Sequence, residues 1–412
     1  MMTGLPPIAF VVPWYGLDVP GGAETHVRHM AEHLRAEGVP VEVWTTCARR
    51  LGTDWSENHH QVGQTVINGV PVTRFPVLDI NRDRYRAIHL RLAYGGSVTP
   101  EEESIYFTQS IRSRALCDHI QAHPEFVCAF TPYLFGTTYW GAYVDPDRSL
   151  LIPCLHDEAF ARLVALRHLF RSVRGVICNS HAEMHLVQRL YGVPDERLAF
   201  IGSGISVAER GDAQAFRERY GISGPFVLYA GRKSPSKNTP LLVNYFCRYR
   251  RRRATDLQLV LIGGRKVYIP PDCAHVVHDL GFIPEQDKQD AYAAATVFCQ
   301  PSVHESFSIV LMEAWVQGTP ALVNARCDVT REHCERGQGG LFFNGYQEFE
   351  AILDRLLVDR PLRKRLGENG RRYVEQNFTW DKVIDRFRKA ARNLCLPVMP
   401  TQSGSKAHDS EA

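Results

Sequence analysis

The chain has 412 residues, more than one typical hydrophobic core supports, so we expect two domains. Charged residues make up 23% of it and the net charge is only +3, which argues against a nucleic-acid partner. Its 11 cysteines include no Cys-x-x-Cys pair, which argues against a zinc site or a disulfide framework and favours buried thiols in a reducing cytoplasm.

No stretch of the sequence approaches the ~18 uncharged apolar residues of a membrane span. The first residues lack a basic region followed by an apolar one, so we expect no secretory signal and predict a cytoplasmic protein. The basic run from Arg250 to Arg253 has two interpretations. It is either a solvated helix end, which we favour, or a contact with anionic lipid at the inner membrane face.

Apolar runs alternate with helical patterns along the first half of the chain. A strand at 8–12 leads through a glycine-rich loop to an amphipathic helix at 23–37. Residues 65–75 predict a hairpin around Asn68-Gly69. Three more strands are expected at 41–46, 150–156 and 175–180, followed by a helix at 181–190.

The second half repeats this alternation. Strands are expected at 226–230, 257–262, 296–301 and 320–324, with a helix at 306–317 between the last two. Apolar strands separated by helices are typical of parallel sheets that are covered on both faces. The sequence therefore predicts an α/β fold with two doubly wound, Rossmann-like domains that face each other across a cleft.

Composition also suggests where the domains meet. The segment 206–223 is polar, so we place an N-terminal domain at 1–205 and a C-terminal domain at 206–380. A last helix at 381–399 is expected to pack back on the N-terminal domain. The polar tail at 400–412 is expected to be disordered.

Two carboxylates eight positions apart, Glu305 and Glu313, form the most informative feature of the chain. Glu313 lies in an otherwise apolar run that predicts a buried helix, and a buried carboxylate needs a polar partner such as a ligand hydroxyl. On one helix the two would lie about 12 Å apart, close to the reach from sugar to sugar across a diphosphate. The free amides at the helix start, residues 305–308, favour an anion there. The alternative for Glu305 is a charge that only stabilises the helix dipole.

A basic loop follows the strand at 226–230. Arg232 and Lys237 flank the start of a helix, with Thr239 as the expected N-cap and Pro240 in its first turn. A helix N-terminus favours phosphate, and both cations suit it. A solvated basic loop is the alternative, but together with the two glutamates we favour a phosphate site.

Three further positions carry weaker signals. Gly21-Gly22 after the first strand lets the backbone approach a phosphate or sugar, or is an ordinary turn. His156 at a strand end either meets a sugar hydroxyl or is a structural residue beside a capping Asp157. The Asp-x-Asp at 145–147 is interpreted as a turn, so no metal site is predicted.

Taken in order, these motifs resemble the family 4 retaining glycosyltransferases, which have the two-domain glycosyltransferase-B fold. The match covers nearly the whole chain. Its motifs are Gly21-Gly22-Ala23-Glu24, the stretch from Gly231-Arg232 to Lys237, Gly281-Phe282-Ile283, and Glu305-x7-Glu313 followed by Gly318-Thr319-Pro320.

The resemblance implies a nucleotide-diphosphate sugar in the C-terminal domain and an acceptor on the N-terminal domain. Arg232 and Lys237 would grip the diphosphate and Glu305 would contact the sugar. His156 would touch the donor sugar, and these four are the expected catalytic residues. Glu313 would hold the ribose hydroxyls.

The resemblance also assigns the remaining donor contacts. The backbone around Phe282 and Ile283 would meet the base, and Gly21-Gly22 would line the cleft near the phosphates. Ser306-Phe307-Ser308 replaces the usual Gly-Phe-Gly, which narrows the sugar pocket or adds hydrogen bonds. Asn238 replaces the usual glycine after the lysine, a change we expect to be tolerated.

The implied function is retaining transfer of a hexosyl or related sugar to a glycan, lipid-linked or small-molecule acceptor, without a metal or other cofactor. Such a reaction belongs to polysaccharide or glycoconjugate biosynthesis. Two alternatives stay open: a nucleotide-sugar epimerase of the same architecture and a non-catalytic sugar-nucleotide-binding protein. The arginines within 79–112 either receive an acidic acceptor or, as we favour, belong to an exposed amphipathic helix. Contact with the membrane surface stays open as well.

Overall fold

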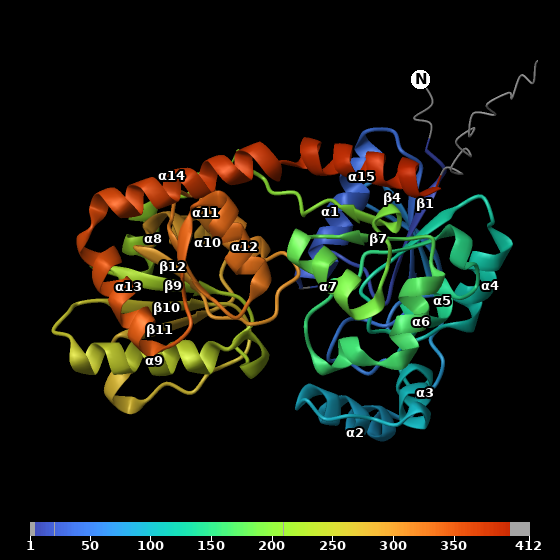
Figure 1. Cartoon of the computed structure of the whole chain (residues 1–412), viewed down its shortest axis with the longest axis horizontal. Coiled ribbons are helices and arrows are strands. Elements are labelled where there is room, and N and C mark those ends of the chain that lie inside the picture. The colour runs from blue at the N-terminus through green and yellow to red at the C-terminus, as the bar shows by residue number, and fades with distance from the viewer. Residues whose placement is uncertain (1–4, 20, 209, 396–412) are drawn as a thin grey trace, which may run out of the picture.

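The computed structural model describes residues 5–19, 21–208 and 210–395. These residues form two α/β units that lie side by side (Figure 1), each built on its own sheet. Within the described residues, no helix is long and apolar enough to cross a membrane. The tail predicted to be disordered, 400–412, lies outside the described residues.

The N-terminal unit is an eight-stranded sheet in the order β3-β4-β2-β1-β5-β6-β7-β8. Neighbouring strands are parallel except β3, which forms a hairpin with β4 through Asn68-Gly69. Its strands are β1 (Ile8–Val12), β2 (Val41–Thr46), β3 (Gly63–Ile67), β4 (Val70–Phe75), β5 (Val127–Phe130), β6 (Ser149–Leu151), β7 (Gly175–Cys178) and β8 (Leu198–Phe200). Its helices are α1 (Gly22–Ala36), α2 (Arg82–Ala93), α3 (Pro100–Thr108), α4 (Arg114–Ala122), α5 (Gly136–Ala142), α6 (Val164–Ser172) and α7 (His181–Tyr191).

The C-terminal unit is a six-stranded parallel sheet in the order β11-β10-β9-β12-β13-β14. Its strands are β9 (Phe226–Ala230), β10 (Gln258–Ile262), β11 (Val277–Gly281), β12 (Val297–Gln300), β13 (Ala321–Asn324) and β14 (Gly340–Phe343). Its helices are α8 (Ala213–Tyr220), α9 (Thr239–Arg252), α10 (Glu285–Ala294), α11 (Ile309–Val316), α12 (Asp328–Gly337), α13 (Tyr346–Val358) and α14 (Arg360–Asn377). The predicted class, two doubly wound α/β domains, is confirmed.

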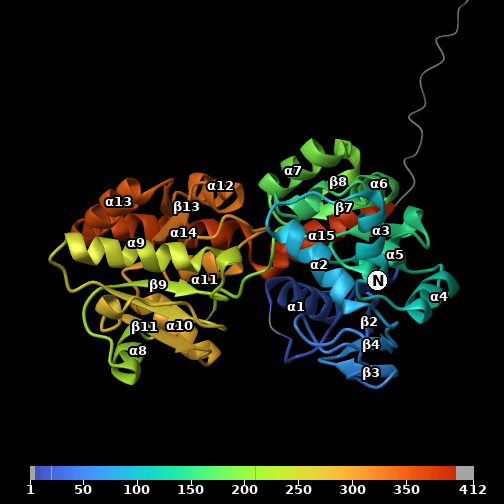
Figure 2. The same ribbon diagram turned by 90° about the horizontal axis from the view of Figure 1, so that it is seen from below.

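The chain returns to its first domain at the end. Helix α14 runs along the C-terminal unit, and α15 (Trp380–Cys395) continues from it across the N-terminal unit (Figures 1 and 2). Val383, Ile384 and Phe387 of α15 are buried in one apolar core with residues of β1, β2 and α1. Since an amphipathic helix stabilises whichever surface its apolar face covers, α15 ties the two units together.

Three of the differences from the predicted element boundaries bear on the site. The predicted helix at 306–317 begins only at Ile309, because Ser308 has a left-handed backbone with φ of 70°. The N-cap of α9 is Asn238 rather than Thr239. Strand β6 ends at Leu151, so the end of the predicted strand 150–156, with His156, is a loop. Strands β5, β8, β11 and β14 were not predicted, since they are short or only partly apolar.

Candidate active site

An ion pair lies where the ends of β9 and β12 meet. Lys237 ends the 3-10 helix Pro235–Lys237 after β9, and Glu305 lies in the loop after β12. Lys237 Nζ is 2.7 Å from Glu305 Oε1 and also donates to the carbonyl oxygen of His304 at 3.3 Å. Glu305 Oε2 makes no hydrogen bond to any described residue. One oxygen of this carboxylate is therefore available to a ligand.

The other two basic residues of the loop after β9 separate into one exposed and one buried side chain. Arg232 is exposed, and its charge opposes the burial that raises the pKa of Glu24 in the N-terminal domain. Lys233 is buried, lies 2.8 Å from Asp279 Oδ1 and donates to the carbonyl oxygen of Gly263. Arg232 thus lies near the N-terminal domain, whereas Lys233 ties the loops that follow β9 and β10 to strand β11.

The first turn of α11 offers free amides to an anion. Its N-cap, Ser308, makes no side-chain capping bond, and the amides of Ile309 and Val310 have no intrahelical acceptor. A helix N-terminus of this kind favours a negative group. Glu305 precedes this helix, so the predicted spacing of Glu305 and Glu313 along one helix is wrong. Phe307 between them is buried in the core of the C-terminal domain.

Glu313 lies on α11 and already has protein partners. Lys288 Nζ is 3.1 Å from Glu313 Oε1, and the Tyr292 hydroxyl donates to Oε2 at 2.9 Å. Burial lowers the pKa of Lys288, but the charges of Glu313 and Glu285 outweigh it and raise this pKa overall. The polar partner that Glu313 needs is therefore supplied by α10. A ligand hydroxyl would join this network rather than complete it.

The N-terminal domain places a second acid and a histidine opposite this loop. His156 Nδ1 is 3.4 Å from Glu158 Oε1, which also accepts from the Tyr133 hydroxyl at 3.1 Å. Burial raises the pKa of Glu158, yet His156 and His304 oppose it and the pKa is lowered overall. The ring of His304 lies with its centroid 6.1 Å from that of His156. Residues of both domains therefore meet here.

Two further pairs cross the same junction. Ser306 of the C-terminal domain lowers the pKa of the Cys154 thiol in the N-terminal domain, which burial raises to about 12. His181 Nδ1 at the start of α7 lies 3.2 Å from Glu332 Oε1 on α12. Polar contacts thus join the two domains at these positions as well.

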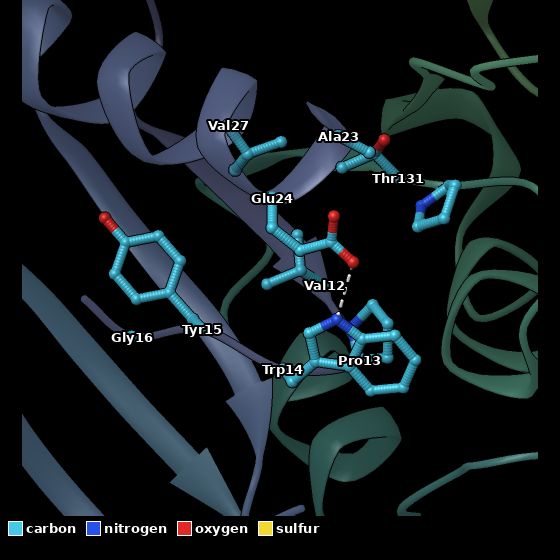
Figure 3. Close-up of a pocket in the computed structure, with 10 residues that line it drawn as sticks. Val12, Pro13, Trp14, Tyr15, Gly16, Ala23, Glu24, Val27 and Thr131 are labelled. Carbon is cyan, nitrogen blue, oxygen red and sulfur yellow. Dashed lines mark hydrogen bonds between the residues drawn. The ribbon is translucent and has the colours of Figure 1, made fainter. Parts of the chain in front are cut away.

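Gly21 is the N-cap of α1 and Gly22 is its first residue, and the helix begins beside a small pocket (Figure 3). Trp14 Nε1 donates to Glu24 Oε1 at 2.8 Å in this pocket, which also contains Thr131. Gly21 has φ of 148°, and a Cβ there would lie 2.0 Å from Glu24 Oε2, so this position accommodates the Glu24 carboxylate. A Cβ on Gly22 would meet nothing within 4 Å, which leaves the backbone at Gly22 open to a ligand.

The loop after β11 presents an aromatic surface. Phe282 is 76% exposed, and its ring lies against Gly264, where a Cβ would come within 2.7 Å of Phe282 Cε2. Ile283 is partly buried against the core of the C-terminal domain. The ring of Phe282 is therefore free to contact a base, while Ile283 anchors the loop. No group of three or more His, Cys, Asp or Glu side chains that could hold a metal occurs among the residues described.

Comparisons with known proteins now decide the family. Residues 21–204 match the family model described as "Glycosyl transferase 4-like domain", and residues 212–373 match "Glycosyl transferases group 1". The chain belongs to the group 1 glycosyltransferases.

Curated relatives and solved structures agree with this assignment. A D-inositol 3-phosphate glycosyltransferase of Acidothermus cellulolyticus is 25% identical over 405 residues, covering 90% of this chain and 86% of that protein. The protein of the same name from Stackebrandtia nassauensis is 27% identical over 250 residues, and the match spans 55% of this chain and 56% of that protein.

Two solved structures share the fold. Sucrose-phosphate synthase from Thermosynechococcus elongatus has a TM-score of 0.71 at 18% identity and covers 94% of this chain and 99% of that one. Anabaena HepE in complex with UDP-glucose has a TM-score of 0.66 at 19% identity and also covers 94% of this chain and 99% of that one. Both place this glycosyltransferase in the two-domain glycosyltransferase-B architecture.

The structure brings several of the predicted residues of this glycosyltransferase to one region. Glu305, Lys237 and the start of α11 lie together, and His156 lies opposite them. Glu313 lies within α11 on a separate hydrogen-bond network. Asn238 adopts a left-handed φ of 56° and donates to the carbonyl oxygen of Pro301 at 3.1 Å, so it replaces a glycine without loss of the turn.

Four site residues escaped the sequence analysis: Lys233, Gln300, His304 and Glu158. Lys233 looked like its basic neighbours, because a sequence does not show which cation of a loop is buried. Glu158 and His304 adjoin predicted residues, and only the junction between the domains brings them near each other. Gln300 ends an apolar strand, and a polar residue at that position was the one available signal.

Proposed function

We propose that this glycosyltransferase is a retaining enzyme that moves a sugar from a nucleotide-diphosphate sugar to an acceptor hydroxyl. The observation that carries the proposal is the ion pair of Lys237 with Glu305 beside the free amides of α11. A cation and a helix N-terminus stabilise a diphosphate, and a carboxylate oxygen next to them accepts hydrogen bonds from sugar hydroxyls.

The comparisons support a small-molecule acceptor as the first to test. Anabaena HepE is described with UDP-glucose, and two curated relatives are named for inositol 3-phosphate. We infer a nucleotide-sugar donor on the C-terminal domain and an acceptor on the N-terminal domain. A phosphorylated polyol, a glycan and a lipid-linked sugar are the acceptor classes to compare.

Each proposed catalytic residue has a distinct task. Lys237 and Arg232 neutralise the charge that develops on the departing diphosphate, together with the amides of Ile309 and Val310. Glu305 binds the transferred sugar through Oε2. His156 approaches the same sugar from the N-terminal domain. Attack from the face of the departing phosphate, which would itself take the acceptor proton, retains the anomeric configuration.

The remaining donor contacts follow from the exposed surfaces near the strand ends. Glu313 would bind the ribose hydroxyls, and Phe282 with the backbone at Ile283 would meet the base. Gly22 would let the backbone approach the phosphates. No metal is assigned to the reaction, because the cations of the loop after β9 and the start of α11 supply the positive potential.

We also infer that the enzyme works in the cytoplasm. The 11 cysteines are all free, and most of them are buried. Free buried thiols are typical of a reducing compartment. The basic run at the end of α9 pairs with acids of its own domain, as in the 2.7 Å contact of Arg251 Nε with Asp272 Oδ2, which favours a solvated helix end over a lipid contact.

The test begins with ligand binding. Thermal unfolding with UDP, GDP and their glucose or mannose conjugates should show a rise in Tm for one nucleotide series, because ligands stabilise the state they bind. That donor is then supplied with inositol phosphates, free glycans and lipid-linked sugars. Proton NMR of the product should show the anomeric configuration of the donor, and a chelator should leave the rate unchanged.

Four results would contradict the proposal. A product with the inverted anomeric configuration would contradict the retaining mechanism. Loss of activity in the presence of a chelator would contradict metal independence. Formation of an epimer from the donor alone, without any acceptor, would identify an epimerase instead. Binding without turnover of any donor and acceptor pair would favour a non-catalytic sugar-nucleotide-binding protein.

A further inference from the structure

Gln300, the last residue of β12, lies beside the Glu305 carboxylate. Its side chain is buried, with the residue only 3% exposed. Gln300 Nε2 donates to Glu305 Oε1 at 2.9 Å and approaches Ser308 Oγ at 3.4 Å. Its own Oε1 is buried and has no hydrogen-bond partner among the described residues.

A buried amide oxygen without a hydrogen-bond partner lowers the stability of the fold, because it has lost its contact with water and gained nothing in exchange. An apolar side chain at the end of β12 would avoid this loss, as at the neighbouring Cys299 and Phe298, which are fully buried. Such exceptions call for an explanation, and a functional position is one of the few available. An apolar side chain at this position could not make the hydrogen bond that Gln300 Nε2 donates to Glu305.

Lys237 and Gln300 share one oxygen of Glu305. Lys237 Nζ lies 2.7 Å and Gln300 Nε2 2.9 Å from Oε1, and Oε2 is left free of both. This sharing directs Oε2 away from the two donors. If Lys237 moves its ammonium group to bind a diphosphate, the amide of Gln300 still donates a hydrogen bond to Glu305 Oε1.

Ser308 supports the same arrangement. It is 5% exposed and has a left-handed φ of 70°, a conformation that is strained for serine and free for glycine. Its hydroxyl lies next to Gln300 Nε2. A serine therefore occupies a position where glycine would have less backbone strain, and its side chain confines the amide of Gln300.

We infer that Gln300 is a positioning residue for sugar transfer. It holds Glu305 through Oε1 so that Oε2 faces the donor sugar while Lys237 binds the diphosphate. This inference rests on the proposed function. It gives a role in sugar transfer to a residue that lies outside the Glu305-x7-Glu313 motif. The competing explanation is that Gln300 only fills the end of β12.

The test uses two variants of the full chain. Gln300→Met keeps the approximate volume and removes the donor, and Gln300→Glu keeps the shape and replaces the amide by a carboxyl group. For Gln300→Met we expect kcat to fall by roughly 10- to 100-fold, in the range for a misplaced catalytic group. The Kd of the free nucleotide diphosphate should stay within about twofold of the wild-type value, because Glu305 is proposed to contact the sugar and not the nucleotide.

Gln300→Glu supplies a readout that a space-filling role would not change. Its new carboxyl would adjoin Glu305, so its pKa should rise above the usual value of about 4.3. Only the protonated form can donate to Glu305 Oε1. We therefore expect the activity relative to wild type to increase as the pH falls from about 8 towards about 5.

Gln258→Met is the matched control. Gln258 begins β10 at the opposite end of the same sheet, and its Oε1 lies 2.6 Å from His278 Nε2. Unchanged kcat in Gln300→Met with wild-type Tm would overturn the inference, as would a Gln300→Glu variant whose relative activity ignores pH. If the wild-type protein transfers no sugar, the proposed function fails and this inference fails with it. If the wild-type protein transfers sugar and the Gln300 variants have the same kcat and pH dependence as wild type, only the inference is refuted.

Discussion

His156 of the N-terminal domain and His304 of the C-terminal domain face each other with ring centroids 6.1 Å apart. His304 directly precedes Glu305, and its carbonyl oxygen accepts from Lys237. Burial lowers the pKa of His304, and the Glu158 carboxylate opposes that shift. The two histidines therefore lie at the junction of the N-terminal and C-terminal domains.

Replacement of Lys237 should abolish most of the transfer activity and leave the fold intact. In the proposed mechanism Lys237 is the cation that stabilises the departing diphosphate, and loss of one such preorganised group reduces kcat by roughly 10²- to 10³-fold. Steady-state kinetics with the donor found by ligand screening would measure this. Circular dichroism would show whether the fold persists.

Lys364→Ala is the control for that experiment. Its side chain is 78% exposed and lies 3.8 Å from Glu368 on α14, away from the site. Its kinetics should match wild type. Wild-type turnover in Lys237→Ala would remove Lys237 from the mechanism.

Glu313→Gln should weaken both stability and nucleotide binding. The change removes one of the two carboxylates that pair with the Lys288 ammonium, leaving Glu285, and disturbs the hydrogen bond from Tyr292. Loss of a buried charged partner typically lowers the free energy of unfolding by about 1–3 kcal/mol. Urea unfolding without ligand measures the first effect, and calorimetry with the nucleotide measures the second. A stable variant with normal nucleotide affinity would show that Glu313 has neither task.

Ser308→Gly should raise the free energy of unfolding by up to about 1 kcal/mol, because glycine adopts the left-handed backbone without strain. Ser306→Gly is the contrast, since it removes the side chain that faces Cys154 and should lower stability. Differential unfolding of the two variants tests this. A destabilised Ser308→Gly would mean that the contact of its hydroxyl with Gln300 outweighs the strain.

Stability should fall as the pH drops from about 6.5 to 4, in part because of His26. Burial, aided by the charge of His29, lowers the pKa of His26 from 6.5 to about 4. The unfolded chain therefore binds a proton in this range that the folded chain does not, which lowers the free energy of unfolding. The contribution is fully present above pH 6.5 and reaches a loss of up to about 3 kcal/mol at the lower end.

The measurement compares urea unfolding of wild type and His26→Gln between pH 7 and pH 4. The variant should lose part of the pH slope, whatever its absolute stability. His168→Gln, at an exposed position, should keep the wild-type slope. If the free energy of unfolding has the same pH dependence in wild type and His26→Gln, the folded protein must protonate His26 as readily as the unfolded chain does.

Much of the fold followed from local patterns. Strands β1, β2 and β9 were predicted to the residue, because each is a short apolar run bounded by a loop. The hairpin of β3 and β4 followed from Asn68-Gly69, whose backbones both adopt positive φ. The missed strand β11 carries His278 and Asp279 and lies at an edge of the sheet, where an apolar run is not required.

The sequence supplied the candidate residues of the site but not the contacts between them. Lys237 and Glu305 were selected for their chemistry, and the sequence could not show that they form one ion pair. Glu305 was placed on the helix of Glu313, because a positive φ at Ser308 cannot be read from a serine. The partners of Glu313 come from α10, which is more than 20 residues away in the chain.

The order of apolar runs and loops, together with the residue types at the strand ends, predicted two α/β domains on largely parallel sheets and a candidate phosphate site. Hydrophobic periodicity and local charge are properties of neighbouring residues, so the sequence alone carries them. Only the tertiary structure decided which oxygen of Glu305 stays free, which lysine is buried and which histidines face each other. Those outcomes depend on distances between segments far apart in the chain, and such distances are fixed when the sheets twist and the two domains pack.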